Sequence, residues 1–413
     1  MVKKLILFAS LFVFSLLNSF AQNYTNGKVI TGAERIETYL PLLKTKAVAV
    51  FANQTSSIAG THLVDSLVKR GINIVKIFGP EHGFRGVADA GEHVENGIDK
   101  KSGLPVISLY GTHKKPTKED LQNVDVVVFD IQDVGVRFYT FISSLEYVLE
   151  ACLENHKPLL ILDRPNPNGF YVDGPVLSTK FKSFVGMQPI PIVYGMTLGE
   201  YALMLAGENL LSAEANKANA YNITTKPSAD TPFHVQVIKC KNYDHTTQYI
   251  LPVNPSPNLR EMQSIYLYPS TCFFEGTVLS EGRGTDKPFQ IFGHPCLPQN
   301  LFAFTPVPND GAKNSKCFNQ LCYGWNLADT KENVLKKVNN KIQLKYLLDA
   351  YKLFPKKDSF FLANNFFNKL AGNDVLMKQI KAGKTEKDIR KTWEKDLIKF
   401  KAIRKKYLLY KDF

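Results

Sequence analysis

A segment rich in glycine and proline, GPEHGFRGVADAGE at residues 79–92, carries an unusual number of ionisable side chains. Glu81 and Glu92 supply two carboxylates, and His82 and Arg85 add a histidine and a cation. A glycosidase needs one carboxyl group that stays protonated as general acid and a second group that attacks the sugar or activates water. The segment therefore predicts that Glu81 and Glu92 are the two catalytic carboxyl groups of a glycosidase. The alternative is that one of the two glutamates caps a helix or pairs with Arg85, and that only the other takes part in catalysis.

The same segment also contains residue types that bind metal ions. His82, Asp89, Glu92 and His93 are good ligand types, but their spacing matches no standard zinc pattern. No G-x-G-x-x-G motif follows the first expected strand, which leaves a dinucleotide site without support. We therefore expect neither a metal nor an organic cofactor, and metal-dependent chemistry is the weaker alternative.

Two further polar segments follow apolar runs, namely DIQDVGVRFYT at 130–140 and LDRPNPNG at 162–169. A carboxylate in such a position can orient a hydroxyl group of a substrate. An arginine can bind a carboxylate of the substrate through two parallel hydrogen bonds. Asp133 has a competing role as the cap of the following helix. The candidate substrate contacts from the two segments are Asp130, Asp133, Arg137, Asp163, Arg164 and Asn166.

A similar segment lies in the second half of the chain, FEGTVLSEGRGTDKPFQIFG at 274–293. Its glycines exclude a regular helix, and charged side chains that become buried there need partners. We expect this segment to fold over the cleft formed by the first half. Its candidate residues are Glu275, Glu281, Arg283 and Asp286.

The elements that position these segments follow from the apolar pattern. INIVKIF, VDVVVFDI and PLLILD are short continuous apolar runs, and amphipathic stretches such as RFYTFISSLEYVLEACLEN separate them. This alternation is typical of a parallel sheet with helices on both faces, so we predict an α/β doubly wound fold. Ligands bind beyond the carboxyl ends of the strands in such a sheet, which is where the polar segments begin.

The chain divides into three expected parts. Residues 1–21 combine a basic start, a short apolar core and small residues before the cleavage point, which predicts a signal peptide and export to the periplasm or the medium. Residues 22–230 carry the α/β pattern, and 231–413 form a smaller α+β domain. No later apolar run is long enough for a membrane span.

Composition adds two expectations. The formal net charge is +13, which favours an anionic polymer or an envelope surface over nucleic acid as partner, although a solvated basic helix face explains it equally well. The six cysteines are too scattered for a disulfide scaffold, and only Cys317 and Cys322 are spaced to pair in an oxidising compartment.

Taken together and in order, FGPEHGFRGVADAGE, SGLPVISLYG, VFDIQDVGVRFYT, LDRPNPNG, IPIVYGMTLGE, NPSPNL and FEGTVLSEGRGTDKPFQ resemble a bacterial family once known only as a domain of unknown function. Its characterised members are NamZ-type exo-β-N-acetylmuramidases. The resemblance covers nearly the whole chain after the signal peptide. It implies a Rossmann-like domain and a smaller second domain. It also implies release of N-acetylmuramic acid from the non-reducing ends of peptidoglycan fragments, in cell-wall recycling or scavenging.

The resemblance also implies roles for particular residues. Glu92 is expected to be the general acid, and the second catalytic group is left open between Glu81, Asp130 and Asp133. The substrate carries a lactyl carboxylate, which suits an arginine, and its sugar ring suits aromatic contacts. The expected substrate contacts are His82, Arg85, Tyr110, Asp130, Arg137, Phe138, Tyr139, Asp163, Arg164, Asn166, Arg283 and Asp286.

Two other functions are compatible with the same residues. A non-catalytic protein that binds muropeptides would keep the fold and the cleft without hydrolysis. A metal-dependent esterase or deacetylase would act on the same polymer and would lose activity on chelation.

Overall fold

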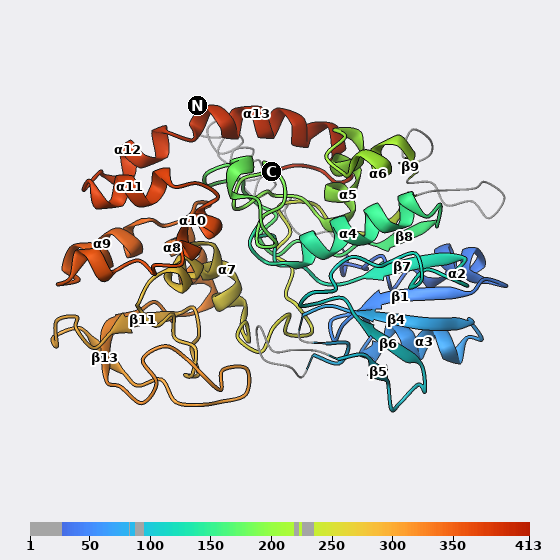
Figure 1. Ribbon diagram of the computed structural model, residues 1–413, viewed down its shortest axis with the longest axis horizontal. Helices are drawn as coiled ribbons and strands as arrows, with labels where there is room; N and C mark the ends of the chain where they lie inside the picture. Colours follow the sequence, from blue (N-terminus) through green and yellow to red (C-terminus); the bar gives the residue numbers. More distant parts are fainter. Residues whose placement is uncertain (1–26, 82, 87–94, 219–222, 225–234) are drawn as a thin grey trace, which may run out of the picture.

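The computed structural model describes residues 27–413 except for 82, 87–94, 219–222 and 225–234 (Figure 1). The expected signal peptide therefore lies outside the described residues, as do His82, Asp89, Glu92 and His93. Within the described part of the chain, no helix is long and apolar enough to cross a membrane.

An eight-stranded sheet with strand order β5-β6-β4-β1-β7-β8-β10-β9 forms the centre of the first half (Figure 1). β5 pairs antiparallel with β6, and the other neighbouring strands run parallel. Without the edge strands β5 and β9, the order is that of a Rossmann sheet, which confirms the predicted fold class. The strands are β1 Val48–Ala52, β4 Ile74–Gly79, β5 Gly97–Ile98, β6 Pro105–Ser108, β7 Val126–Asp130, β8 Leu159–Leu162, β9 Ile223–Thr224 and β10 Val235–Ile238.

Helices cover both faces of this sheet. Because side chains alternate along a strand, Ala49 and Phe51 of β1 join one apolar core, and Val48 and Val50 join the other. The first core is covered by α4 (Phe141–Glu154) and α5 (Leu198–Gly207), and the second by α2 (Ile36–Leu43) and α3 (Leu63–Lys69). Every residue of β1 and β7 is buried, as expected for central strands of a doubly covered parallel sheet. A short helix, α6 (Ala213–Ala218), packs beside α4, and a small hairpin, β2 (Ser57–Ile58) with β3 (Thr61–His62), follows β1.

The second half combines a small antiparallel sheet with a series of helices (Figure 1). The strands are β11 Ile291–His294, β12 Phe302–Phe304 and β13 Cys322–Asn326, with β13 in the middle. This arrangement agrees with the predicted α+β character. The helices are α7 Met262–Thr271, α8 Lys331–Val338, α9 Lys345–Leu353, α10 Phe366–Ala371, α11 Val375–Lys381, α12 Glu386–Lys391 and α13 Glu394–Arg404.

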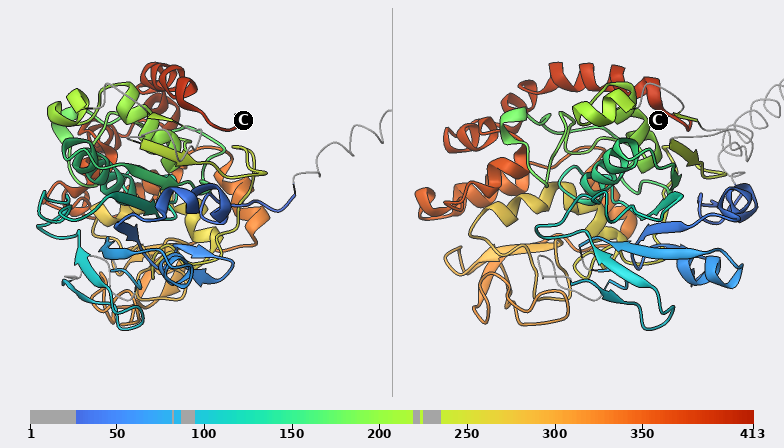
Figure 2. Two further views of the ribbon diagram at one scale, coloured as in Figure 1. Left: turned by 90° about the vertical axis from the view of Figure 1, so that its right-hand side faces the viewer. Right: turned by 45° about the vertical axis from the view of Figure 1, so that its right-hand side comes forward.

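The two halves share one apolar core rather than meeting across a polar interface. Val127 and Ile161 of the large sheet belong to the same buried cluster as Phe292 of the small sheet and Phe400 of α13. In the views of Figure 1 and Figure 2, α13 runs back from the second half toward α5 and α6. β10 follows residue 230 and still belongs to the large sheet, so that sheet draws on both sides of the expected boundary. The domain division itself stays a prediction.

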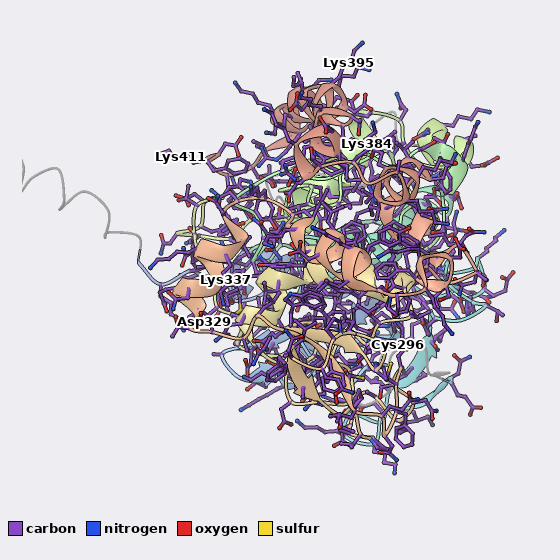
Figure 3. All side chains as sticks on the ribbon, turned by 90° about the vertical axis from the view of Figure 1, so that its left-hand side faces the viewer. Cys296, Asp329, Lys337, Lys384, Lys395 and Lys411 are labelled. Carbon is purple, nitrogen blue, oxygen red and sulfur yellow. The ribbon has the colours of Figure 1, made fainter. Side chains whose placement is uncertain are left out.

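The end of the chain returns to the first half. Tyr410 donates a hydrogen bond of 2.6 Å to Asp163 Oδ2, and the Leu409 amide donates one of 2.8 Å to Glu200 Oε1. Lysines of the C-terminal helical region point outward, as Lys384 and Lys395 do in Figure 3. Part of the positive charge is therefore a solvated surface.

Candidate active site at the carboxyl edge of the sheet

A cavity of about 380 Å³ lies between the carboxyl ends of three sheet strands and the second half of the chain. Glu81 follows β4, Tyr110 follows β6, and Tyr139 and Thr140 lie between β7 and α4. The polar segment that the sequence places over the cleft contributes Arg283 from the opposite side, which agrees with that prediction. The remaining lining residues are Phe138, Phe141, Phe184, Val185, Ser256, Leu259, Tyr268, Glu275, Phe289 and Phe366.

Glu81 is held at both of its carboxylate oxygens. The Tyr110 hydroxyl donates a hydrogen bond of 2.9 Å to Oε1, and the Thr140 hydroxyl donates one of 3.2 Å to Oε2. Burial and the neighbouring Glu81 carboxylate raise the pKa of Tyr110, so its hydroxyl keeps the proton that it donates. The carboxylate thus has a defined orientation beside the cavity.

Glycine is required where the loop after β4 passes the loop after β1. Gly86 has a φ of +74°, and a Cβ there would lie 2.4 Å from the Gln54 side chain. Gln54 in turn donates to the carbonyl groups of Asn254 and Pro255, each at 3.2 Å. Gly86 therefore allows the loops after β4 and β1 to meet the segment that contains Asn254 and Pro255.

An aromatic wall closes one side of the cavity. Tyr268 of α7 makes edge-to-face contacts with Phe289, at 4.8 Å between ring centroids, and with Phe138, at 5.4 Å. Tyr139 packs against Tyr268 and donates its hydroxyl to the Pro255 carbonyl group at 2.8 Å. Aromatic faces of this kind suit the apolar face of a sugar ring.

Arg283 supplies a cation to the cavity. Its Nη2 lies 2.7 Å from Glu275 Oε1, its Nε lies 3.3 Å from Glu281 Oε1, and its guanidinium group lies over the Phe289 ring at 5.1 Å. Lys316 also pairs with Glu281, at 2.9 Å. Burial raises the pKa of Glu281, but Lys316 and Arg283 outweigh it and lower that pKa overall. The buried carboxylate is therefore ionised and holds Arg283 in position.

Several predicted contacts lie elsewhere and have structural partners. Arg164 and Asp130 form a buried bidentate ion pair, with Nε to Oδ1 at 2.6 Å and Nη2 to Oδ2 at 2.9 Å. Asp163 accepts hydrogen bonds from Thr197 and Gly199 at the start of α5. Asn166 donates to the Met196 carbonyl group. The structure does not bring these four residues to the cavity around Glu81.

Asp133 and Arg137 are also buried away from this cavity. Asp133 accepts from the Gly135 amide at 2.6 Å and from the Tyr194 hydroxyl, so it holds the turn before α4 rather than capping that helix. Arg137 donates to the carbonyl groups of Pro175, Ile190 and Leu370. Burial lowers the pKa of Arg137 to about 9, and Arg137 does not line the cavity around Glu81. The expected catalytic role of Asp133 and the substrate contact of Arg137 therefore have no support in the structure.

Arg85 and Asp286 also lie outside the cavity around Glu81. Arg85 pairs with Asp99 at 2.7 Å and with Asp65 at 3.3 Å, and it does not line the cavity. Asp286 is exposed at the turn after Arg283 and does not line the cavity. Of the three arginines considered for a substrate carboxylate, Arg283 is the one that the described residues place in the cavity.

Sequence reasoning missed part of the site. Thr140 ends the DIQDVGVRFYT segment, and its position after an expected strand could have marked it as a candidate site residue. Tyr268 lies in a sequence that is typical of an ordinary core, and Phe289 lies in the 274–293 segment, where only the charged residues are candidates. Among the residues that the structure describes, no group of three or more His, Cys, Asp and Glu side chains is arranged to hold a metal ion.

Comparisons with known proteins agree with this arrangement. Residues 48–263 match the family model of the exo-β-N-acetylmuramidase NamZ N-terminal domain, and residues 266–410 match that of its C-terminal domain. The chain is 38% identical over 407 residues to the peptidoglycan β-N-acetylmuramidase NamZ of Bacillus subtilis, covering 93% of this chain and 92% of that protein.

Two crystal structures of DUF1343 family proteins from Bacteroides fragilis have the same fold. The first is 46% identical, with a TM-score of 0.82 over 94% of this chain and 100% of the other. The second is 28% identical, with a TM-score of 0.76 over 93% of this chain and 99% of the other. With both family models matched in order and the fold shared over nearly the full length, the chain belongs to the NamZ family of exo-β-N-acetylmuramidases.

Proposed function

We propose that the chain is a glycoside hydrolase that removes N-acetylmuramic acid from the non-reducing ends of peptidoglycan fragments. The observation that carries the proposal, beside family membership, is the cavity that combines the oriented Glu81 carboxylate, the aromatic wall and Arg283. At about 380 Å³ the cavity suits one sugar unit with its substituents rather than a long glycan strand, as an exo-acting enzyme requires.

The two glutamates of the 79–92 segment would divide the acid and base roles. The hydroxyl groups of Tyr110 and Thr140 fix the orientation of the Glu81 carboxylate, so Glu81 suits the group that activates water or attacks the anomeric carbon. Glu92 lies outside the described residues and keeps the predicted role of general acid, which protonates the leaving glycosidic oxygen.

Arg283 would bind the lactyl carboxylate of N-acetylmuramic acid. Glu275 and Glu281 hold the guanidinium group, and an arginine fork matches a carboxylate through two parallel hydrogen bonds. N-acetylglucosamine lacks that carboxylate, so this contact would separate the two sugars.

The test is hydrolysis of a chromogenic β-N-acetylmuramide by purified protein. Glu92→Gln and Glu81→Gln should each lower kcat/KM at least about a hundredfold, the scale of general acid–base catalysis. Glu214→Gln, an exposed residue of α6, is the matched control and should keep full activity. Full activity of both Glu81→Gln and Glu92→Gln, with normal folding, would overturn the assignment.

The alternative functions give different results in the same assay. A binding protein would retain muramic-acid disaccharides without releasing free sugar. A metal-dependent esterase or deacetylase would leave the glycosidic bond intact and would lose its activity with a chelator.

The site of action is part of the proposal. The basic start and apolar core of residues 1–21 support export to the periplasm or the medium, where peptidoglycan fragments are present. Cell fractionation of the full chain tests this. Recovery of the uncleaved chain in the cytoplasm would contradict it.

A further inference from the structure

Two cysteines bracket the loop 317–322 at the start of β13. The Cys317 side chain packs against the small apolar cluster that contains Cys322. A tight turn joins them, because the Gln320 amide donates to the Cys317 carbonyl group at 3.0 Å. Both are free thiols in the structure.

The backbone of this loop has an unusual conformation. Cys317 has a φ of +55° and Asn319 a φ of +54°, in the left-handed region that residues with a Cβ rarely adopt. Asparagine tolerates this region, whereas cysteine does so at a cost. The contacts of Cys317 with the cluster that contains Cys322 accompany this conformation and help to hold it.

The two thiols differ in a way that suits thiol–disulfide exchange. Cys317 is partly exposed, whereas Cys322 is fully buried. The Cys322 thiol and the Lys316 ammonium group lower the pKa of Cys317, and the hydrogen bond to Cys317 raises that of Cys322. An accessible thiol with a lowered pKa is the better attacking group, and its buried neighbour is placed to complete the exchange.

We propose that Cys317 and Cys322 form an intramolecular disulfide in an oxidising compartment, and that this bond fastens the loop that supports Arg283. The oxidant is a small-molecule or protein disulfide. The Cys317 thiolate attacks one sulfur of that disulfide and forms a mixed disulfide, releasing the first thiol. Cys322 then loses its proton and attacks Cys317 Sγ, which releases the second thiol. The oxidant gains two electrons and two protons.

The loop is connected to the cavity through Lys316. Its ammonium group donates to the carbonyl groups of Phe274, at 2.7 Å, and Leu279, at 3.0 Å, and pairs with Glu281. Glu281 contacts Arg283, which lines the cavity. The disulfide adjoins Lys316 and restricts the backbone from which it reaches this network. The effect on substrate binding rests on the proposed function, whereas the bond itself does not.

The bond is tested by mass spectrometry of the full mature protein after incubation with oxidised glutathione or with dithiothreitol. We expect the oxidised protein to lose two hydrogen atoms and to yield one peptide pair that joins Cys317 to Cys322. Cys296 is the internal control, because it is exposed at the surface (Figure 3). It should be alkylated after dithiothreitol, and after oxidised glutathione it should carry only a glutathione adduct that dithiothreitol removes. Recovery of Cys317 and Cys322 as free thiols after oxidation, or of Cys317 only as a glutathione adduct, would overturn the proposal.

The role of the bond is tested by comparing Cys317→Ser/Cys322→Ser with Cys296→Ser. Oxidation should raise the Tm of the parent protein and of Cys296→Ser by about 2 °C. It should leave the Tm of the double variant unchanged. Reduction should raise the KM for a muramide substrate about twofold with little change in kcat, because Arg283 binds the substrate rather than the reacting atoms. Equal Tm values of the parent protein in both redox states would contradict the fastening role. The mass and Tm measurements do not require enzymatic activity, so they test the bond even if the protein is inactive.

Discussion

At the scale of single residues, the site depends on how polar groups hold one another. Tyr110 and Thr140 orient Glu81, and Glu275 and Glu281 orient Arg283. These supporting residues are part of the chemistry because a carboxylate or a guanidinium group that swings freely loses the alignment that catalysis and recognition need.

The Tyr110 hydroxyl tests this support. Tyr110→Phe removes one hydrogen bond to Glu81, and a bond to a charged group contributes about 1.5–3 kcal/mol, so kcat/KM should fall at least about tenfold. Tyr249→Phe in the separate cavity beside Arg164 is the matched control and should leave kcat/KM unchanged. Equal losses in both variants, or none in either, would show that the hydroxyl does not support the carboxylate.

Arg283→Lys tests substrate recognition. Lysine keeps the charge but loses the planar fork, so KM for a muramide should rise about tenfold, while binding of a ligand without the lactyl group should not change. Arg85→Lys should leave KM unaltered, since Arg85 is paired with Asp65 and Asp99 outside the cavity. Steady-state kinetics of both variants separate the two arginines, and a raised KM in Arg85→Lys alone would contradict the assignment.

The sequence could predict only part of the site at this scale. Charged residues after strands identified Glu81, but the same signal also selected the buried pair of Asp130 and Arg164. A charge that binds substrate and a charge that satisfies a buried partner look alike in sequence, because both follow apolar strands and both lie near glycine. Only the distances between side chains separate the two roles.

At the scale of elements, the turn between β7 and α4 positions Tyr139 and Thr140. Asp133 fixes this turn through the Gly135 amide. Burial raises the pKa of Asp133 from 3.8 to about 6, so the folded protein holds this proton more tightly than the unfolded chain. The contribution of Asp133 to stability is therefore fully present below pH 3.8 and is lost as the pH rises through about 6.

Asp133→Asn removes this titration. Relative to the variant, the parent protein should lose up to about 3 kcal/mol of its free energy of unfolding between pH 4 and pH 7. Urea denaturation at both pH values measures the difference, and Asp286→Asn, at an exposed position, is the matched control. Parallel pH curves for the parent protein and Asp133→Asn would contradict the prediction.

Most of the large sheet could be predicted because its strands are continuous apolar runs between amphipathic helices. The order of those strands, and the return of β10 to the sheet after residue 230, could not be predicted. Neither leaves a local pattern, since strand order depends on which crossovers pack best over the whole sheet. The short strands of the second half were equally hard to place, because three or four residues carry little periodic signal.

At the scale of the whole molecule, the shared core predicts cooperative unfolding. Residues from β7 to α13 belong to one buried cluster, so we expect a single calorimetric transition rather than one for each half. Tyr410→Phe removes the hydrogen bond to Asp163 and should lower the free energy of unfolding by about 1–3 kcal/mol while keeping one transition. Phe413→Ala, at a half-exposed residue nearby, should cost less. Two separate transitions in the parent protein would contradict the shared core.

The contacts of Leu409 and Tyr410 also make the stability of the first half depend on residues that are synthesised late. Because a chain is made from its N-terminus, Asp163 and Glu200 emerge long before Tyr410 and Leu409 provide their partners. A chain that stops a few residues short has the whole sheet and the whole cavity but lacks the contacts that close its first half. We therefore expect a chain that is truncated before Leu409 to be more open to proteases than one that contains Leu409 and Tyr410.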